Sequence, residues 1–375
     1  MTSVDFSRRA KTDPTEILRQ RDGLYGVELM GAAISGLNFF SWLEANPSSK
    51  EQICQSLKIH ERPTDVMLTF FTAMGLIEKR LSPNSLSPLG GEGQGEGAVF
   101  HLTQLAREFL SDRSQWNLIA YYQAMDQRPV CKDMLTVLRT GKPATWASYK
   151  DQKEWAKAME DERFARMFTA AMDCRGVYIG QALADRVNLK THKRLLDIAG
   201  GSGVYACALV AANSHLSATI LEKPPVDKIA REMIQSRGFH PLSPAGREGQ
   251  SEGAARVQVH VSDMFTDSFP PNHDIHLFSN VLHDWDVPIV KQLIAKSVAS
   301  LPPGGLIVIH DAYINADKSG PLPVAAYSVL LMGMTEGKCY STAEMQSYLQ
   351  EAGFTNFTFA PTAADRGVMT GRKPR

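Results

Sequence analysis

The sequence predicts an α/β protein: a doubly wound, Rossmann-like sheet in the C-terminal half, preceded by an all-α region with the outline of a winged helix. Three observations predict this class. From residue 194 onwards, short apolar runs alternate with helical patterns, as they do in parallel sheets that carry helices on both faces. A glycine-rich turn joins the first of these runs to its helix. Before residue 114, helical periodicity predominates.

The N-terminal region is expected to form helices followed by a hairpin. Helical patterns cover residues 17–37, 48–57 and 64–74, and hairpin strands cover residues 75–80 and 98–102. Ser49 has the character of a helix cap, because the polar Glu51 and Gln52 follow it. Helix, helix and hairpin make a winged-helix shape over residues 1–112. The helix at 64–74 is apolar and carries no Arg or Lys, so we expect it to pack inward or against another subunit rather than to read DNA.

Residues 113–190 are predicted to form a helical connector. Helical patterns cover residues 116–125, 132–138, 154–159 and 164–183, and the segment is rich in aromatic and methionine side chains. Each of these side chains alone is better explained as helix core. As a set they favour an aromatic substrate pocket, for which Met125, Phe168 and Met172 are candidates, with Asn280 from farther along the chain.

Charge and cysteine content narrow the function classes. Lys plus Arg equals Asp plus Glu, 40 against 40, so no net charge attracts nucleic acid or a membrane surface. The five cysteines are scattered without a CxxC pair, which argues for reduced thiols and against a metal site. No run approaches the ~20 apolar residues of a membrane span, and residues 1–14 carry no export signal. We expect a cytoplasmic protein with no nucleic-acid or membrane partner.

Residues 87–98 and 243–254 are copies of one element, because they match at most positions. Both are rich in Gly, Glu, Ser and Pro, and both fall between expected strands or helices. Flexible surface insertions are the expected structure, and a catalytic lid is the functional alternative.

The C-terminal segment, residues 191–375, is predicted to be the cofactor-binding domain. Expected strands cover residues 194–198, 217–221, 257–261, 274–279 and 305–311, and expected helices cover residues 202–213, 225–237, 287–300 and 342–352. A final antiparallel pair is expected at residues 355–359 and 367–370. Dehydrogenase sheets less often close with such a pair.

The turn after the first strand runs through Ala199, Gly200 and Gly201 and has no bulky side chain. A nucleotide-like ligand can therefore lie against bare backbone at the carboxyl end of the strand. Residues 201–206 also fit the G-x-G-x-x-A motif of dinucleotide-binding proteins. Asp197 disfavours a pyrophosphate, because its charge would repel the phosphates, whereas it suits the ammonium group of S-adenosylmethionine.

Two more acids follow the next two strands. Glu222 lies 222 minus 203, or 19, positions after Gly203, close to the ~20 expected of an acid that binds ribose hydroxyls. Because both candidate ligands contain a ribose, this spacing does not choose between them. Asp263 offers a carboxylate to the adenine amino group, and Met264 and Phe265 offer apolar surface to its ring. Each acid alone could be a solvated loop residue or a helix cap, but acids at three successive strand ends favour a ligand site.

His283 follows the fourth strand and is the candidate general base. Imidazole titrates near neutral pH, so it can take a proton from a phenolic or enolic hydroxyl as the oxygen attacks. A lone histidine is more often structural, but a place at a strand end that faces the cofactor favours catalysis. Asp311, at the end of the fifth strand, is the candidate partner that orients the ring, and His310 should point the other way.

With these residues, the chain resembles the S-adenosylmethionine-dependent O-methyltransferases of the plant caffeic acid, acetylserotonin, and bacterial pigment and antibiotic type. The motifs LDIAGGSG (196–203), DMF (263–265), HDW (283–285) and LPPGG (301–305) occur in the family's order and spacing, and the likeness spans nearly the whole chain. The resemblance implies an N-terminal dimerisation domain, hence a homodimer, and S-adenosyl-L-methionine as cofactor. It also implies that Glu222 holds the ribose and that Asp263 and Met264 hold adenine. His283 would then deprotonate a hydroxyl of a small, aromatic or polycyclic acceptor.

Some positions depart from the family's pattern. Ser279 stands where many relatives have a lysine, and Ala199 replaces the first glycine of the turn. Neither change forbids cofactor binding, so both positions stay in the predicted cofactor site. The second acid that flanks the histidine in plant relatives would fall near Cys339, which leaves Asp311 alone, or with Glu336, to orient the base.

Other function classes stay open. An N- or C-methyltransferase would depend on proximity more than on a base. An NAD-dependent oxidoreductase and a non-catalytic ligand sensor are less favoured by these residues.

Overall fold

A computed structural model describes residues 4–81, 98–143, 158–239 and 256–375. The chain divides into two compact units. We call them the sheet unit, with Met1–Leu18, Lys153–Tyr313 and Thr342–Arg375, and the helical unit, with Arg19–Gln152 and Ile314–Ser341. The two insertions expected at residues 87–98 and 243–254 lie almost wholly outside the described residues, as does most of the helix expected at 154–159.

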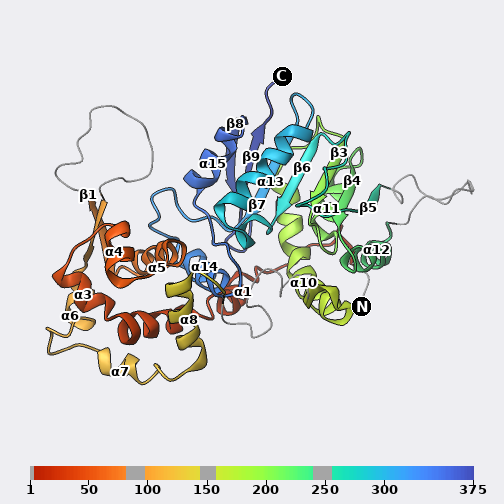
Figure 1. The fold of residues 1–375 in the computed structure, drawn as a ribbon. Helices are drawn as coiled ribbons and strands as arrows, with labels where there is room; N and C mark the ends of the chain where they lie inside the picture. Colours follow the sequence, from red (N-terminus) through yellow and green to blue (C-terminus); the bar gives the residue numbers. More distant parts are fainter. Residues whose placement is uncertain (1–3, 82–97, 144–157, 240–255) are drawn as a thin grey trace, which may run out of the picture. The chain divides into compact units, whose positions relative to one another are not determined.

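The sheet unit contains a seven-stranded sheet in the order β5-β4-β3-β6-β7-β9-β8 (Figure 1). The strands are β3 (Arg194–Ile198), β4 (Ser217–Glu222), β5 (Val257–Val261), β6 (Ile275–Ser279), β7 (Leu306–Asp311), β8 (Thr355–Pro361) and β9 (Gly367–Arg372). The first five run parallel, and β9 pairs antiparallel with both β7 and β8. The predicted strands and the predicted antiparallel ending are confirmed to within two residues at each end.

The strand order reverses direction between β3 and β6. The helices of this unit are α10 (Glu162–Arg186), α11 (Val204–Ala212), α12 (Val226–Ser236), α13 (Val287–Ser300) and α15 (Thr342–Glu351). α10 packs on α11 and α12, whereas α13 packs on α15. Right-handed crossovers that leave β3 in one direction and β6 in the other put their helices on opposite faces and open a crevice at the carboxyl ends of these two strands.

Continuous apolar runs form the central strands because both of their faces are covered. Leu195, Ile275, Leu277 and Ile309 are fully buried, and every residue of β6 and β7 is buried. The sheet is therefore a rigid platform, and the loops at its carboxyl edge are free to carry polar side chains.

The helical unit contains short helices and one hairpin. Its elements are α2 (Gly26–Gly31), the π-helical turn η1 (Ala32–Gly36), α3 (Phe39–Ala45), α4 (Lys50–Leu57), α5 (Glu61–Ala73), β1 (Ile77–Leu81), β2 (Ala98–Leu102), α6 (Gln104–Phe109), α7 (Ile119–Gln123), α8 (Pro129–Thr140) and α14 (Leu322–Met334). The boundary between the two units falls within α1 (Thr15–Asp22). Strands β1 and β2 pair antiparallel, as predicted.

Several local predictions for this unit can be compared with the structure. Ser49 forms the expected cap, with a capping box to Gln52. The helix predicted from residue 64 begins earlier, at Glu61, because Pro63 is tolerated in a first turn. The helix predicted at 116–125 is wrong in extent, since only α7 is helical there. No helix was expected at α14, which is apolar on all faces and so has no amphipathic stripe to detect.

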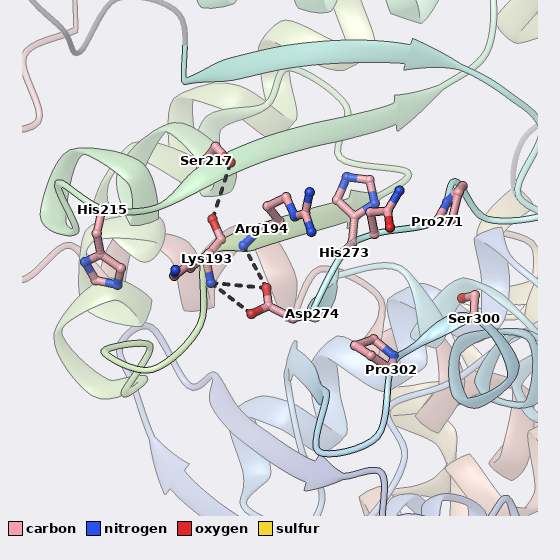
Figure 2. A pocket seen from close by; sticks show the side chains of 10 residues that line it. Lys193, Arg194, His215, Ser217, Pro271, His273, Asp274, Ser300 and Pro302 are labelled. Atoms are coloured by element: carbon pink, nitrogen blue, oxygen red, sulfur yellow. Dashed lines mark hydrogen bonds between the residues drawn. The ribbon is translucent and has the colours of Figure 1, made fainter. Parts of the chain in front are cut away.

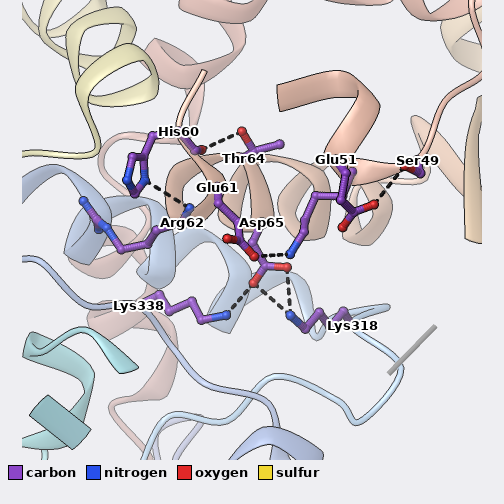
Figure 3. Close-up of polar contacts among 10 residues, drawn as sticks. Ser49, Glu51, His60, Glu61, Arg62, Thr64, Asp65, Lys318 and Lys338 are labelled. Carbon is purple, nitrogen blue, oxygen red and sulfur yellow. Dashed lines mark hydrogen bonds and ion pairs between the residues drawn. The ribbon is translucent and has the colours of Figure 1, made fainter. Parts of the chain in front are cut away.

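An ion cluster holds the segment 314–341 to α5 within the helical unit (Figure 3). Asp65 accepts hydrogen bonds from Lys318, at 2.8 and 2.9 Å, and from Lys338, at 2.5 Å. Burial raises the pKa of Asp65, but the two ammonium groups outweigh burial and hold the pKa far below its usual value. Arg62 donates to the carbonyl oxygen of Gly337 at 2.7 Å. These contacts fix a segment that is remote in sequence from the rest of its unit.

Among the described residues, no helix is both long and apolar enough to cross a membrane. The cysteines Cys54, Cys131, Cys174, Cys207 and Cys339 are free thiols.

Candidate active site

The turn between β3 and α11 is built for close approach of a ligand. Ala199 and Gly201 have positive φ angles of 52° and 57°. A Cβ added to Gly200 would lie 2.6 Å from the carboxylate of Asp197, so only glycine fits there. A Cβ added to Gly201 would meet no described atom within 4 Å. The turn is therefore packed tightly against Asp197 at Gly200, whereas it has open space beside Gly201.

Glu222 and Asp197 lie on neighbouring strands beside this turn. The Glu222 carboxylate accepts hydrogen bonds from the amides of Gly201, at 2.8 Å, and Lys223, at 3.2 Å. The Asp197 side chain is buried, and neither of its oxygens has a partner within hydrogen-bond distance among the described residues, although the amide of Ala206 points toward it. A buried carboxylate without a partner is costly and calls for a donor that the described residues do not supply.

Burial shifts the protonation of both acids. It raises the pKa of Asp197 to about 8, and the charge of Glu222 adds to the rise. Burial also raises the pKa of Glu222 to about 7, against the lowering effect of the two amides. A ligand that brings positive charge or hydrogen-bond donors would stabilise the ionised forms of both groups. This pair of carboxylates fits the ammonium and ribose groups of an adenosyl amino acid.

The loop after β5 carries the third acid. Asp263 accepts a hydrogen bond from the amide of Phe265 at 2.8 Å, and the Lys223 ammonium lies 3.9 Å from its carboxylate. Met264 is buried. The ring of Phe265 packs edge-on against Trp285, with centroids 4.7 Å apart. The loop that was expected to hold adenine therefore contacts the segment that follows His283.

His283 lies in a short 3-10 turn, η2 (Leu282–Asp284), which is separated from the end of β6 by Asn280 and Val281. Its Nδ1 is 2.5 Å from Oδ1 of Asp311, and both side chains are buried. Burial raises the pKa of Asp311, but the neighbouring His283 and the amide of Ala312 outweigh burial, and the pKa lies below its usual value. The expected contact between the two residues is present, with an ionised carboxylate at Nδ1.

Asp284 lies on the other side of the same ring, with its Oδ1 3.6 Å from Nε2 of His283. Burial raises the pKa of Asp284, and the charge of Asp311 adds to the rise, while His283 lowers it. The two acids beside the imidazole are thus shifted in opposite directions, which is a pattern typical of catalytic sites. The sequence analysis did not find Asp284, although its place next to His283 in the chain was the available signal.

Ser279, the last residue of β6, and Asn280, which follows it, lie within a polar network. His310 Nδ1 is 2.9 Å from the Ser279 hydroxyl, and its Nε2 is 3.1 Å from the Thr362 hydroxyl. Burial lowers the pKa of His310 to about 3, so this ring stays neutral and structural. Asn280 has a φ of 54° and donates from its side-chain amide to Tyr205 at 3.0 Å. The Ser279 hydroxyl is therefore engaged by His310.

The predicted pocket residues fall in both units. Phe168 and Met172 lie half-buried on α10 of the sheet unit, where Phe168 stacks on Phe164 with centroids 6.4 Å apart. Met125 lies in the helical unit, as do Glu336 and Cys339. Glu336 forms an ion pair with Lys142 at 2.5 Å, and the amide of Cys339 donates to Ser328 at 3.1 Å. In the sheet unit, two acids therefore lie beside His283 among the described residues: Asp311 and Asp284.

An open cavity of about 630 Å³ lies at the amino ends of the parallel strands, opposite the candidate active site (Figure 2). It is lined by residues at or just before the starts of β3, β4, β6 and β7: Lys193, Arg194, His215, Ser217, Pro271, Asn272, His273, Asp274, Ser300 and Pro302. The Asp274 carboxylate accepts the amides of Lys193 and Arg194 at 3.0 and 2.7 Å. Ligands of doubly wound sheets bind at the carboxyl ends of the strands, so this cavity is not the candidate active site. No cluster of His, Cys, Asp or Glu suited to a metal ion occurs in the described part of the chain.

Comparison with known proteins identifies the family of this chain. A family model described as the O-methyltransferase domain matches residues 132–355. The 3-hydroxy-5-methyl-1-naphthoate 3-O-methyltransferase of Streptomyces sahachiroi is 28% identical over 96% of this chain and 95% of its own length. The L-tyrosine C(3)-methyltransferase of Streptomyces lavendulae is 27% identical over 90% and 87%. A crystal structure of an O-methyltransferase family 2 protein from Planctomyces limnophilus in complex with apigenin superimposes with a TM-score of 0.82, at 29% identity and full coverage of both chains. The chain therefore belongs to the O-methyltransferase domain family.

Proposed function

We propose that this protein transfers a methyl group from S-adenosyl-L-methionine to a hydroxyl of a small aromatic or polycyclic molecule, with His283 as general base. One observation carries the proposal. The carboxyl edge of the sheet combines the buried, unpartnered carboxylate of Asp197 with the buried His283–Asp311 pair. The first suits a cationic ligand, and the second suits a base that must hold a proton during the reaction.

The donor supplies an electrophilic methyl group on a sulfonium, so the protein needs to align two reactants and remove one proton. Glu222, held by two backbone amides, would accept hydrogen bonds from the ribose hydroxyls. Asp197 would compensate the ammonium charge from beneath the turn of Ala199, Gly200 and Gly201. These assignments give the buried Asp197 carboxylate a hydrogen-bond donor and add donors to the two amides that already bind Glu222.

The loop after β5 would hold the other end of the ligand. Asp263 would accept from the adenine amino group, and the side chains of Met264 and Phe265 would cover the ring. Ser279 lies at the end of β6, on the strand next to β3, and stays a candidate for the cofactor site. Its hydroxyl would have to share or exchange the hydrogen bond that it makes with His310.

His283 would act through Nε2, because Nδ1 is engaged by Asp311. Nε2 of His283 would take the acceptor proton as the acceptor oxygen bonds to the methyl group, which the sulfonium of the donor would supply with its sulfur as leaving group. Asp311, ionised over the neutral range because its pKa is lowered, offsets the charge of the imidazolium. Asp284, 3.6 Å from Nε2, would contact the acceptor beside the reacting hydroxyl.

The acceptor class rests on the relatives and on the side chains near the crevice. One relative is named for a hydroxynaphthoate, and a similar crystal structure contains the flavone apigenin. Both molecules are flat, aromatic and hydroxylated. We infer that Phe168, Met172 and Asn280, which all belong to the sheet unit, line the acceptor pocket.

A C-methyltransferase is the second candidate, because the tyrosine-methylating relative transfers to carbon. Transfer to carbon or nitrogen depends less on a base than transfer to a phenol. We therefore expect His283→Gln to lower turnover of a phenolic acceptor strongly and turnover of a matched aniline only slightly.

Assembly and location follow from the resemblance and the composition. We propose that residues 1–112 form a winged-helix-like domain through which two copies associate, that residues 113–190 contribute to the pocket, and that residues 191–375 bind the cofactor. The scattered free thiols support a cytoplasmic location.

Calorimetry with S-adenosylhomocysteine and NAD, combined with a methyl-transfer screen, tests the proposal. We expect the homocysteine compound to bind and NAD not to bind, and we expect methyl uptake by hydroxylated naphthoates or flavones. Methyl transfer to the matched amines or ring carbons, with none to hydroxyls, would contradict the O-methylation.

A further inference from the structure

Lys296 of α13 lies beneath the loop after β5. Its ammonium group donates to three backbone carbonyls of that loop: Met264 at 2.5 Å, Asp267 at 2.7 Å and Phe265 at 3.1 Å. An ammonium has three protons, so these carbonyls use its whole donor capacity. The same group lies 4.8 Å from the ring centroid of Phe269, which adds a cation–π contact.

Three carbonyl dipoles that converge on one point repel one another unless a cation lies between them. Lys296 therefore offsets the repulsion between the converging carbonyls of this loop, as the metal ion does in a calcium-binding loop. Asp267 completes the turn, because its carboxylate accepts the Asp263 amide at 2.8 Å and the Ser262 hydroxyl at 3.1 Å. The inner side of the loop is thus fixed by one helical side chain and one acid.

The fixed loop carries the Asp263 carboxylate in a defined position. That carboxylate accepts the Phe265 amide at 2.8 Å, so its orientation depends on the backbone of the residues whose carbonyls Lys296 binds. The Phe265 ring in turn contacts Trp285, two residues after His283. Lys296 is thereby connected to both the adenine side of the site and the catalytic turn.

We propose that Lys296 is a positioning residue that sets the selectivity of the site for adenine over other purine bases. The proposal rests on the proposed function, in which Asp263 accepts from the 6-amino group of adenine. A carboxylate held in place attracts a 6-amino group and repels the 6-oxo group of hypoxanthine. Without the cation, the carbonyls separate, and the carboxylate loses its fixed direction.

The test compares two ligands in two variants. S-adenosylhomocysteine and S-inosylhomocysteine differ at the purine 6-position, and their affinities are measured by calorimetry on the full chain. The variants are Lys296→Met, which keeps the length of the side chain without its charge, and Lys291→Met as the matched control. Lys291 lies on the same helix, but its ion pair with Glu351 is on the surface.

We expect Lys296→Met to weaken binding of S-adenosylhomocysteine about tenfold, on the scale of one charge-assisted hydrogen bond, and to leave binding of the inosyl compound nearly unchanged. The ratio of the two affinities should stay as in the natural protein for Lys291→Met. Should Lys296→Met fail to fold, Lys296→Gln keeps two donors and should show a smaller loss of the same ratio. In either variant, KM for the donor should rise more than kcat falls.

The proposal is overturned if Lys296→Met leaves the ratio of the two affinities unchanged. An equal loss of affinity for both ligands, for example, would mean that Lys296 has only a structural role. A failure of the proposed function looks different. In that case the unaltered protein binds neither homocysteine compound, or Asp263→Asn leaves the ratio unchanged while Lys296→Met changes it.

Discussion

The imidazole of His283 and the carboxylate of Asp311 are 2.5 Å apart at the ends of two adjacent parallel strands, and both are buried. The carboxylate fixes the proton of the neutral ring on Nδ1 and so leaves Nε2 as the basic nitrogen. Because the pKa of Asp311 is lowered, it keeps its charge over the neutral range.

We therefore predict that Asp311→Asn lowers kcat for a phenolic acceptor by roughly 10²-fold or more, since an amide cannot offset the imidazolium charge. Affinity for S-adenosylhomocysteine should change little. Steady-state kinetics and calorimetry on the same preparation check both expectations. A kcat within threefold of the unaltered protein would remove Asp311 from the mechanism.

Asp197 and Glu222 of the proposed cofactor site predict a pH dependence of ligand binding. The pKa of Asp197 is raised to about 8 and that of Glu222 to about 7, so both are largely protonated below neutrality in the free protein. The ammonium group and the ribose hydroxyls of the ligand favour the ionised carboxylates, so its binding must release protons. Affinity for S-adenosylhomocysteine should therefore fall as pH decreases from 8 to 6, by up to about tenfold per pH unit for each group that loses a proton. Calorimetry in two buffers of different ionisation enthalpy measures the protons released, and pH-independent binding would contradict the assignment.

Asp197→Asn should separate stability from binding. Folding raises the pKa of the Asp197 carboxyl from its ordinary value of 3.8 to about 8. The folded protein therefore becomes less stable as pH rises between these two values, because the unfolded chain releases the proton more easily. The neutral amide avoids this loss, so the variant should melt at a higher temperature than the unaltered protein at pH 8. It should also bind S-adenosylhomocysteine much more weakly. Thermal melts from pH 5 to pH 8 test this, and a variant less stable at every pH would refute the explanation.

Ala199 is held in the left-handed region, with a φ of 52°. This conformation costs a non-glycine residue about 1–2 kcal/mol, while glycine loses about 0.5–1 kcal/mol of chain entropy on folding. Ala199→Gly should therefore stabilise the protein by about 0.5–1 kcal/mol, with donor affinity unchanged. Urea titration measures the change. Destabilisation would mean that the Ala199 methyl makes contacts worth more than the strain.

The Asp65 cluster should dominate the stability of the helical unit. Asp65→Asn leaves the buried ammonium group of Lys338 and the partly buried one of Lys318 facing an amide and should cost about 3–5 kcal/mol. Because the pKa of Asp65 is lowered by folding, its contribution is complete above the unfolded pKa near 4 and disappears as pH falls below it. The matched control is Glu61→Gln, which breaks a more exposed pair with Lys50 and should cost less than about 1 kcal/mol. Equal effects of the two changes in urea unfolding would argue against a special role for the cluster.

Much of the sheet unit could be predicted because its strands are continuous apolar runs with clear breaks. The contact between His283 and Asp311 also followed from the sequence, since residues that end adjacent parallel strands meet at one edge. α14 could not be predicted in the same way, because a helix that is apolar all round has no periodic signal.

Several other contacts between residues that are far apart in the chain could not be predicted from the sequence. Nothing local indicates that residues 314–341 join the helical unit, because the connection depends on Lys318 and Lys338 meeting Asp65. Asp284 was missed because the η2 turn, rather than a strand, decides where its side chain points. Lys296 was missed because its partners are backbone carbonyls, which carry no sequence signal.

The most direct measurement is single-turnover methyl transfer by His283→Gln with saturating donor and a hydroxylated naphthoate or flavone, alongside calorimetry with S-adenosylhomocysteine. We predict that the rate falls by roughly 10²- to 10⁴-fold while the affinity for the homocysteine compound stays within about threefold. A rate equal to that of the unaltered protein would contradict the assignment of His283 as the base.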